Sequence, residues 1–181
     1  VTIISSRFSI PYVHIFTVHS NRMKVIFQAG TSLQSKKLKP NSYAFDLKSP
    51  VGIIPTAARS GITILANDVT ASPQYVPSKY FPKKVHSELT IPLKVGEDVI
   101  GVLDLQSDKL RAFSQADLDL FESLASGIAL SLRNASLFHS EKWRRQVSDS
   151  FRDIAGLLIT NLALPELLDR ILQALETSLP C

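Results

Sequence analysis

One carboxylate in this sequence lies in a stretch that otherwise looks built for burial. Asp104 belongs to residues 98–107, DVIGVLDLQS, whose apolar side chains are typical of a buried strand. Strand alternation puts Asp104 on the face opposite Leu103 and Leu105. A carboxylate that leaves water needs a hydrogen-bond donor or a cation, because an unpaired buried charge is costly. Asp104 is therefore a candidate ligand-binding residue, unless a neighbouring backbone N–H or water at the strand end satisfies it.

Two further pairs of side chains could contact a small molecule. Asn67 and Asp68 follow the short apolar run at residues 62–65, where they either line a pocket or stabilise a turn through their own side chains. Tyr75 and Tyr80 lie in a segment with three prolines, ASPQYVPSKYFPKK. Aromatic rings in such a segment can stack on a planar ligand or cover the core.

Two histidines and a phenylalanine complete the candidate ligand residues. His14 and Phe16 share one face of the β-rich run at residues 12–18, as pocket residues or as plain core. His86 precedes the apolar run at residues 87–95 and could equally be an exposed loop residue.

The sequence shows no pattern typical of an enzyme active site. It contains no nucleophile with a partnered base, no glycine-rich phosphate loop and no HxxxH or cysteine cluster. The single cysteine, Cys181, is the last residue, which argues against a disulfide framework or a thiolate metal cluster. We therefore predict a protein without catalytic activity, and the sequence identifies no cofactor or metal.

The net charge of +4 is concentrated near the start of the chain. Residues 1–48 hold seven basic residues against Asp46 alone. The lysines at 36, 37 and 39 lie in a polar stretch without stacking aromatics, which favours a solvated loop over a nucleic-acid interface. No apolar run approaches the roughly 20 residues of a membrane span, and no signal peptide or initiator Met is present. We expect an internal fragment of a cytoplasmic protein.

The candidate residues must be positioned by short strands and one long helix. The runs at 12–18 and 23–29 predict a hairpin, and those at 87–95 and 98–107 predict a second one through Gly96-Glu97. Shorter strands are expected at 43–48 and 62–65. Between them, Ser49-Pro50 is expected to open a helix that Gly61 ends. Pro55 falls inside this helix and predicts a kink or a later start.

Residues 114–164 predict one long helix or two nearly continuous ones. Ser114 is an expected N-cap with Asp117 at the third helical position, and apolar residues then recur three and four apart. Farther along, four apolar residues have the four-three-four spacing of a coiled-coil seam. These four residues are Val147, Phe151, Ile154 and Leu158. Together with Leu132 they predict a parallel homodimer through the long helix.

Several antiparallel strands with helices beside them predict an α+β fold. Residues 1–138 fall within the usual size range of one domain, and we expect a connector helix at 139–162. The last segment, 163–181, reads as an amphipathic helix that begins another domain.

The sequence resembles a GAF domain over residues 1–138. The resemblance rests on the runs FSIPYVHIFTV, SPVGIIPTAARSG, ITILANDV, SELTIPLKVGEDVIGVLDLQS and AFSQADLDLFESLASGIALSLRNASLF, in this order and at these spacings. It implies a central six-stranded antiparallel sheet with helices on both faces, followed by a long C-terminal connector helix, and a ligand pocket on the face of Asp104. It also implies that the opening helix of the domain is missing or nearly so, and that residues 163–181 form the first helix of a second GAF domain.

The resemblance also bears on the ligand. Cyclic-nucleotide-binding GAF domains carry an acidic residue at the position of Asp104, but their Asn-Lys and Asp-Glu pairs read Gln106-Ser107 and Asp117-Leu118 here. Bilin attachment uses a cysteine, and the related free-methionine-sulfoxide reductases need thiols, whereas residues 1–138 contain no cysteine. These departures argue against a cyclic nucleotide, a bilin and reductase chemistry.

The resemblance favours a regulatory module of a multidomain, bacterial-type signalling protein such as a sensor histidine kinase. It would bind an unidentified small molecule and relay its presence through the long helix to an output domain. The alternative is a ligand-free dimerisation or protein-interaction module whose pocket is filled by its own side chains. Neither hypothesis includes a nucleic-acid or membrane partner.

Overall fold

A computed structural model describes residues 1–33, 35–77, 84–159, 166, 168–169 and 172–173. Side chains are described for these residues except at 22 and 153–159. By their contacts the residues divide into two units, 1–133 and 134–181, whereas the sequence placed a boundary at residue 138. Among the described helices, none is long and apolar enough to cross a membrane.

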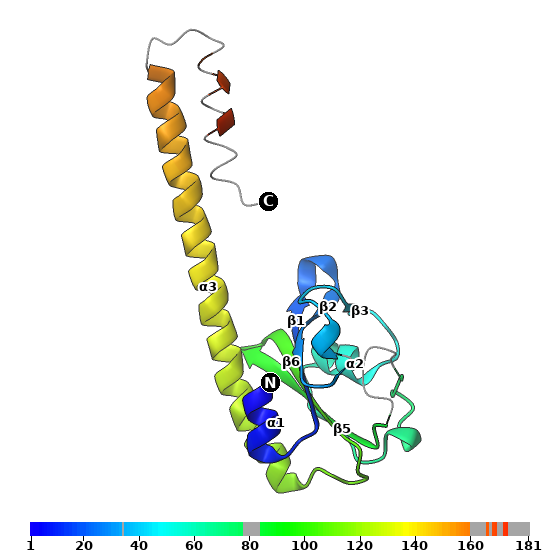
Figure 1. The fold of residues 1–181 in the computed structure, drawn as a ribbon. Helices are drawn as coiled ribbons and strands as arrows, with labels where there is room; N and C mark the ends of the chain where they lie inside the picture. The colour runs from blue at the N-terminus through cyan, green and yellow to red at the C-terminus, as the bar shows by residue number, and fades with distance from the viewer. Residues whose placement is uncertain (34, 78–83, 160–165, 167, 170–171, 174–181) are drawn as a thin grey trace. The chain divides into compact units, whose positions relative to one another are not determined.

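The first unit is built on a six-stranded antiparallel sheet with the order β3-β2-β1-β6-β5-β4 (Figure 1). Its strands are β1 (Tyr12–His19), β2 (Lys24–Gly30), β3 (Ala44–Asp46), β4 (Ile64–Ala66), β5 (Ser87–Val95) and β6 (Asp98–Ser107). The predicted hairpins are β1–β2, which is closed by the short 3₁₀ turn Ser20–Arg22, and β5–β6, in which Val95 pairs with Asp98. The predicted α+β fold with a six-stranded antiparallel sheet is confirmed.

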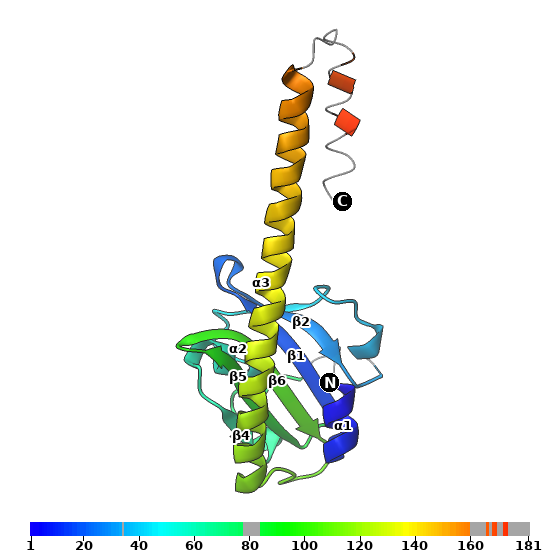
Figure 2. The ribbon, with the colours of Figure 1, turned by 90° about the vertical axis from the view of Figure 1, so that its left-hand side faces the viewer.

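One face of the sheet packs against the first part of the long helix α3 (Gln115–Ile159), which crosses it in Figure 2. Leu103 and Leu105 lie in this core with Phe121 and Ala125 of the helix. The short helix α1 (Thr2–Phe8) lies beside α3, and the rings of Phe8 and Phe121 meet edge to face at 5.1 Å. This opening helix was expected to be missing or nearly so, and it has seven residues in the structure.

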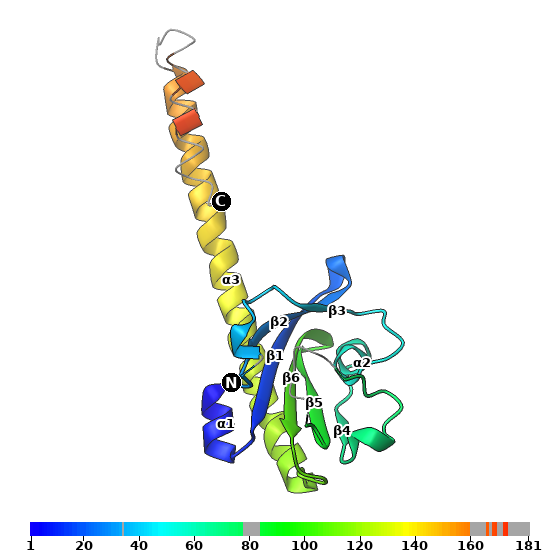
Figure 3. The same cartoon turned by 45° about the vertical axis from the view of Figure 1, so that its right-hand side comes forward.

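The other face of the sheet carries the helix α2 (Ile53–Ser60), seen to the right of β5 and β6 in Figure 3. Its N-cap is Gly52 and its C-cap is Gly61, so the predicted end is right and the predicted start at Ser49 is wrong. Pro55 explains the difference, because the later start places it in the first turn, where no intrahelical N–H bond is lost. Ile54 and Ala58 pack onto Phe16 and Val102 of the sheet.

The long helix starts as the sequence predicts. The Ser114 N–H donates to Asp117 Oδ2 at 2.8 Å, and the Asp117 N–H donates to Ser114 Oγ at 3.2 Å. This reciprocal capping box satisfies two backbone donors that would otherwise lack partners at the helix start. From there the helix runs without a break for 45 residues.

Candidate functional site

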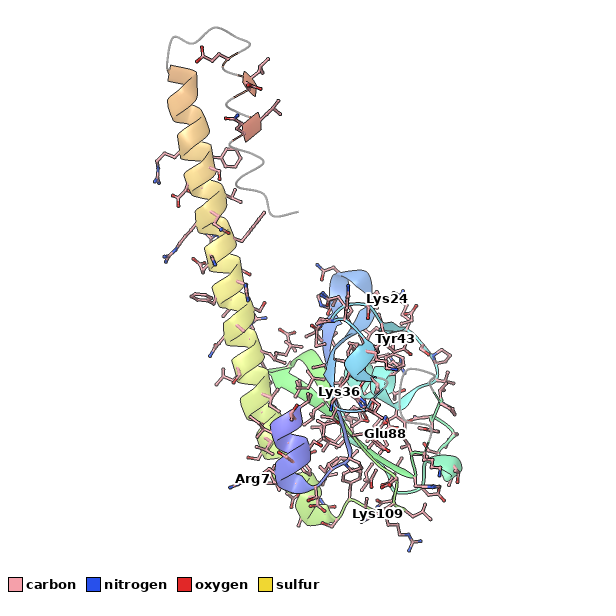
Figure 4. The ribbon with its side chains drawn as sticks, viewed as in Figure 1. Arg7, Lys24, Lys36, Tyr43, Glu88 and Lys109 are labelled. Atoms are coloured by element: carbon pink, nitrogen blue, oxygen red, sulfur yellow. The ribbon has the colours of Figure 1, made fainter. Side chains whose placement is uncertain are left out.

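Five buried polar side chains gather on the α2-bearing face of the three central strands. Asp104 of β6 lies between His14 of β1 and Thr90 of β5, each its direct cross-strand partner, and Glu88 is paired in the same way with Gln106. His14, Thr90 and Asp104 are fully buried, and Glu88 and Gln106 are 3% and 4% exposed. We call these five residues the polar cluster. In Figure 4, Glu88 lies in the middle of the unit, whereas Lys109 and Arg7 lie at its edge.

Asp104 is the acceptor at the centre of the polar cluster. His14 Nδ1 is 3.0 Å and Gln106 Nε2 2.9 Å from Asp104 Oδ2, and the Thr90 hydroxyl is 3.1 Å from Asp104 Oδ1. The same hydroxyl lies 3.2 Å from Glu88 Oε1. Three side-chain donors therefore converge on one carboxylate, which answers how a strand built for burial accommodates it.

The polar cluster holds a proton between its two acids. Burial, then the Asp104 charge and a hydrogen bond to Asp104, raise the pKa of Glu88 well above its ordinary range. Burial raises the pKa of Asp104 to about 7, and its hydrogen bonds to Glu88, Thr90 and Gln106 oppose that rise. Of the two acids, Asp104 is the one favoured as the ionised carboxylate, because it accepts from three donors, and the shared proton is favoured on Glu88.

His14 is neutral in this setting. Burial lowers its pKa to about 3. Its Nδ1 faces a carboxylate, which only accepts hydrogen bonds once ionised, so the imidazole carries its proton on Nδ1. His14 therefore supplies a donor and no positive charge.

The position of His14 is fixed from the other side by Gly30 and Ser35. A Cβ on Gly30 would lie 2.6 Å from the His14 ring and 2.4 Å from Ser35 Oγ, so this position excludes any side chain. Ser35 is buried and bonded to Ser32. The loop that carries the exposed Lys36 and Lys37 is thus packed directly against the polar cluster.

Two apolar groups flank the polar cluster. On the β2 side lies a hydrophobic core that includes Phe16. Phe16 is therefore a core residue, which was one of its two expected roles. On the β4 side, Tyr75 packs against Ala66, Val69 and their neighbours. Burial, then the charges of Glu88 and Asp104, raise the pKa of the Tyr75 phenol. Tyr75 therefore stands within electrostatic reach of both acids.

The remaining predicted ligand residues are not brought into the polar cluster. Asp68 is exposed and its Oδ1 accepts from the N–H and hydroxyl of Thr70, which is the turn-stabilising alternative. His86 is exposed, with its backbone N–H bonded to Ser107. Asn67 is half-buried, and its Oδ1 has no hydrogen-bond partner among the described residues. Tyr80 lies outside the described residues.

Glu88, Thr90 and Gln106 were missed as site residues, although the sequence carries a signal for them. Leu89, Ile91 and Leu93 lie in the same core as Leu103 and Leu105, so strand alternation places Glu88 and Thr90 on the face of Asp104. The turn alone does not give this pairing, because the register shifts between Leu93 and Lys94, and only beyond that shift does Thr90 pair with Asp104 and Glu88 with Gln106. Following the alternation of one strand onto its hairpin partner would have found all three.

A separate pocket of about 360 Å³ lies between α1 and the start of α3. Phe8, Pro11, Lys109, Phe113 and Phe121 are among its lining residues. It includes none of the predicted ligand residues.

The predicted dimer residues on α3 differ in their surroundings. Leu132 is partly buried and packs against the sheet core. The reason is that α3 still lies on the sheet at this point. Val147 is half-buried and Phe151 is 69% exposed. Ile154 and Leu158 are helical, but their side chains lie outside the described ones.

Comparison with known proteins gives both a family and a fold. Residues 8–133 match the family model of the GAF domain. The GAF domain of a phosphoenolpyruvate-protein phosphotransferase from Coxiella burnetii is 17% identical, with 77% of this chain and 82% of that chain covered and a TM-score of 0.69. The corresponding Acinetobacter domain is 14% identical, with coverage of 77% and 81% and a TM-score of 0.66.

An enzyme shares the same fold. The type II free methionine-R-sulfoxide reductase from Thermoplasma acidophilum is 23% identical over 71% of this chain and 83% of its own, with a TM-score of 0.58. No curated protein sequence matches the chain. At these identities the structural neighbours show the fold alone. The family match, which spans well over half of the sequence, shows that the chain belongs to the GAF domain family.

Proposed function

We propose that this GAF domain is a non-catalytic sensor that binds a small molecule over the polar cluster. The observation that supports this most is the cluster itself, because Asp104 and the four buried polar side chains around it are costly in a sheet face that could be apolar. Perturbed acids of this kind collect at functional sites. The ligand contacts proposed are Asp104, Glu88, Gln106, His14 and Tyr75.

The proposed output is the long helix, and hydrogen bonds support a connection from the ligand side to it. The Arg111 N–H donates to the Asn67 carbonyl at 2.9 Å, and the Ser87 hydroxyl donates to the Lys109 carbonyl at 2.8 Å. These bonds hold the loop that leads into α3. Thr63, just before β4, also donates to Glu122 of α3. A shift of β4 or β5 on ligand binding would be felt at the helix start.

The wider setting follows from the same proposal. The module would belong to a multidomain cytoplasmic signalling protein such as a sensor histidine kinase, with a second GAF domain beginning at residue 163. It would act as a parallel homodimer through α3, with an output domain elsewhere in the full-length protein. We propose no cofactor, and no cyclic nucleotide or bilin as the ligand.

A ligand-free interaction module is the second candidate, and one observation favours it. Several large apolar side chains on α3 are exposed: Leu130, Leu137, Phe138, Trp143 and Phe151. Exposed large apolar side chains that gather on one molecule are typical of a contact surface. In this case the polar cluster would serve only the specificity of the fold.

Thermal-shift titration of the chain against a metabolite library separates the two. The sensor proposal expects at least one compound to raise Tm, by mass action on the folded state, and expects Asp104→Asn to abolish that rise. Asp98→Asn, an exposed aspartate at the start of the same strand, is the matched control and should keep it. If no compound raises Tm, the interaction module is the better account.

A further inference from the structure

The hydrogen-bonding capacity of the polar cluster is unbalanced. Hydrogen bonds from His14, Thr90 and Gln106 converge on Asp104. In contrast, Gln106 Oε1 is buried and has no hydrogen-bond partner among the described residues. Gln106 Oε1 is therefore a buried acceptor that can take an N–H or O–H donor from outside.

The direction of the Gln106 amide follows from its neighbour. Its Nε2 lies 2.9 Å from Asp104 Oδ2, and turning the amide over would set two acceptor oxygens against each other. Gln106 also lies directly across from Glu88 in the β5–β6 register. Its Oε1 and the carboxyl groups of Glu88 and Asp104 thus form one group of oxygen atoms.

Among the described residues, no cation is bonded to this group of oxygens, and the lysines of the loop packed against His14, Lys36 and Lys37, are exposed. On β1, His14 is neutral, and β4 carries no titratable side chain. On α2, Arg59 bonds the carbonyls of Leu47 and Ser49. On β5, Lys94 reaches the Gly61 carbonyl, and the segment after β4 contributes the phenol of Tyr75. Two acids without a cation keep only one negative charge between them by holding a proton.

We infer that the ligand of this site carries a cationic nitrogen, as an ammonium, amidinium or guanidinium group, and that its binding displaces the proton shared by Glu88 and Asp104. This inference rests on the proposed function, because it names the chemistry of the same site. In the step, the Glu88 O–H bond breaks and the proton leaves to solvent. The N–H groups of the ligand then donate to both carboxylates and to Gln106 Oε1. Before binding, protonated Glu88 and ionised Asp104 together carry a charge of −1. After binding, the two carboxylates and the cationic ligand also sum to −1, so no charge is added to the buried site.

Proton release gives the inference a direct measurement. Isothermal titration of the chain with benzamidine and benzylamine, in phosphate and in Tris at pH 7.5, yields the number of protons released from the difference in heat. We expect about one proton per ligand bound, and an affinity that rises about tenfold per pH unit while Glu88 holds its proton. Benzamide and benzyl alcohol, the neutral counterparts, should bind at least tenfold more weakly.

Two variants locate the proton. Glu88→Gln copies the protonated acid, so it should fold while releasing no proton and losing the pH dependence of binding. Glu97→Gln, an exposed position in the β5–β6 turn, should match the unmodified chain. Because the pH dependence of the unmodified chain is itself a readout, the test does not depend on a variant.

The outcomes separate this inference from the sensor proposal. Cation binding without proton release, or neutral compounds binding as well as the cations, overturns the inference and leaves the sensor proposal standing. The inference is also overturned, and the sensor proposal kept, if only neutral or anionic metabolites raise Tm and Asp104→Asn abolishes that rise. If neither the cations nor any metabolite binds, both are overturned.

Discussion

The imidazole of His14 and the carboxylate of Asp104 face each other across β1 and β6, with Nδ1 3.0 Å from Oδ2 and neither side chain exposed. The two residues are 90 positions apart in the chain, so their contact ties the first strand of the sheet to the last. Because His14 is neutral, the contact is a hydrogen bond and supplies no opposite charge to Asp104. The ionised carboxylate therefore depends on the number of its donors.

Removing the charge of Asp104 should show this dependence. Asp104→Asn keeps the shape, but the new amide competes as a donor with His14 and Gln106, leaving buried groups without acceptors. We expect a loss of about 2–4 kcal/mol in the free energy of unfolding, measured in urea at pH 7.5. The exposed Asp98→Asn should change stability by less than about 0.5 kcal/mol. Equal effects in the two variants would contradict the assigned hydrogen bonds.

The two acids should make the protein less stable as the pH rises. Burial raises the pKa of Asp104 to about 7 and the pKa of Glu88 well above its ordinary value. Their contribution is therefore fully present below their unfolded values near pH 4 and is lost as the pH rises through the folded values. His14 acts in the opposite direction, because burial lowers its pKa to about 3. Its contribution to the free energy of unfolding is lost as the pH falls below about 6.5. From pH 6 to 7 the loss from the acids exceeds the remaining gain from His14, so stability should fall.

Glu88→Gln should flatten that fall. It removes one of the two titrating acids, so stability should decline by about 1.4 kcal/mol less per pH unit over the range in which Glu88 keeps its proton. Urea unfolding at half-unit steps from pH 6 to 9 measures both slopes. Glu97→Gln should run parallel to the unmodified chain, and a parallel line for Glu88→Gln would show that the proton is not held there.

A methyl group on Gly101 should force β1 and β6 apart. Its Cβ would meet the Phe16 carbonyl oxygen at 2.5 Å, a backbone atom that cannot rotate away. We expect Gly101→Ala to lower the free energy of unfolding by about 1–3 kcal/mol. Gly127→Ala, in open space on α3, should instead raise it by about 0.5–1 kcal/mol.

The capping box should account for a measurable part of the stability of α3. In Ser114→Ala, the Asp117 N–H loses its acceptor and Asp117 loses the hydroxyl donor at 2.6 Å. We expect a loss of about 1 kcal/mol by chemical denaturation. Ser126→Ala is the control, because that hydroxyl bonds only a carbonyl of its own helix. No difference between the two would mean that the cap is not formed in solution.

An acidic residue at Phe151 should weaken the proposed homodimer. Phe151 is 69% exposed, and Phe151→Glu would place a charge in the seam. Light scattering over a range of concentrations should then report a dissociation constant at least tenfold higher. Gln146→Glu, about 140° around the helix, should leave it unchanged. A monomer in the unmodified chain at high concentration would remove the basis for this proposal.

The sequence predicted the elements better than the contacts between them. Both hairpins, the Ser114 cap and the opposite faces of Asp104 and Leu103 follow from local rules of alternation and capping, and the structure has all of them. The start of α2 was misplaced because Ser49-Pro50 imitates a cap, while Pro55 decides where the helix can begin. The partnership of His14 with Asp104 was out of reach, since nothing local relates two residues so far apart in the chain.

The two-residue turn between β5 and β6 also has a consequence for the order of folding. Glu88, Thr90, Asp104 and Gln106 all come from this one hairpin, whose pairing includes a register shift between Leu93 and Lys94. Loops this short close in microseconds, well before contacts between distant strands form. The acids are therefore brought together early, still hydrated, and lose water only when His14 arrives with β1. Kinetic experiments should find that Thr90→Val slows folding, whereas His14→Gln mainly speeds unfolding.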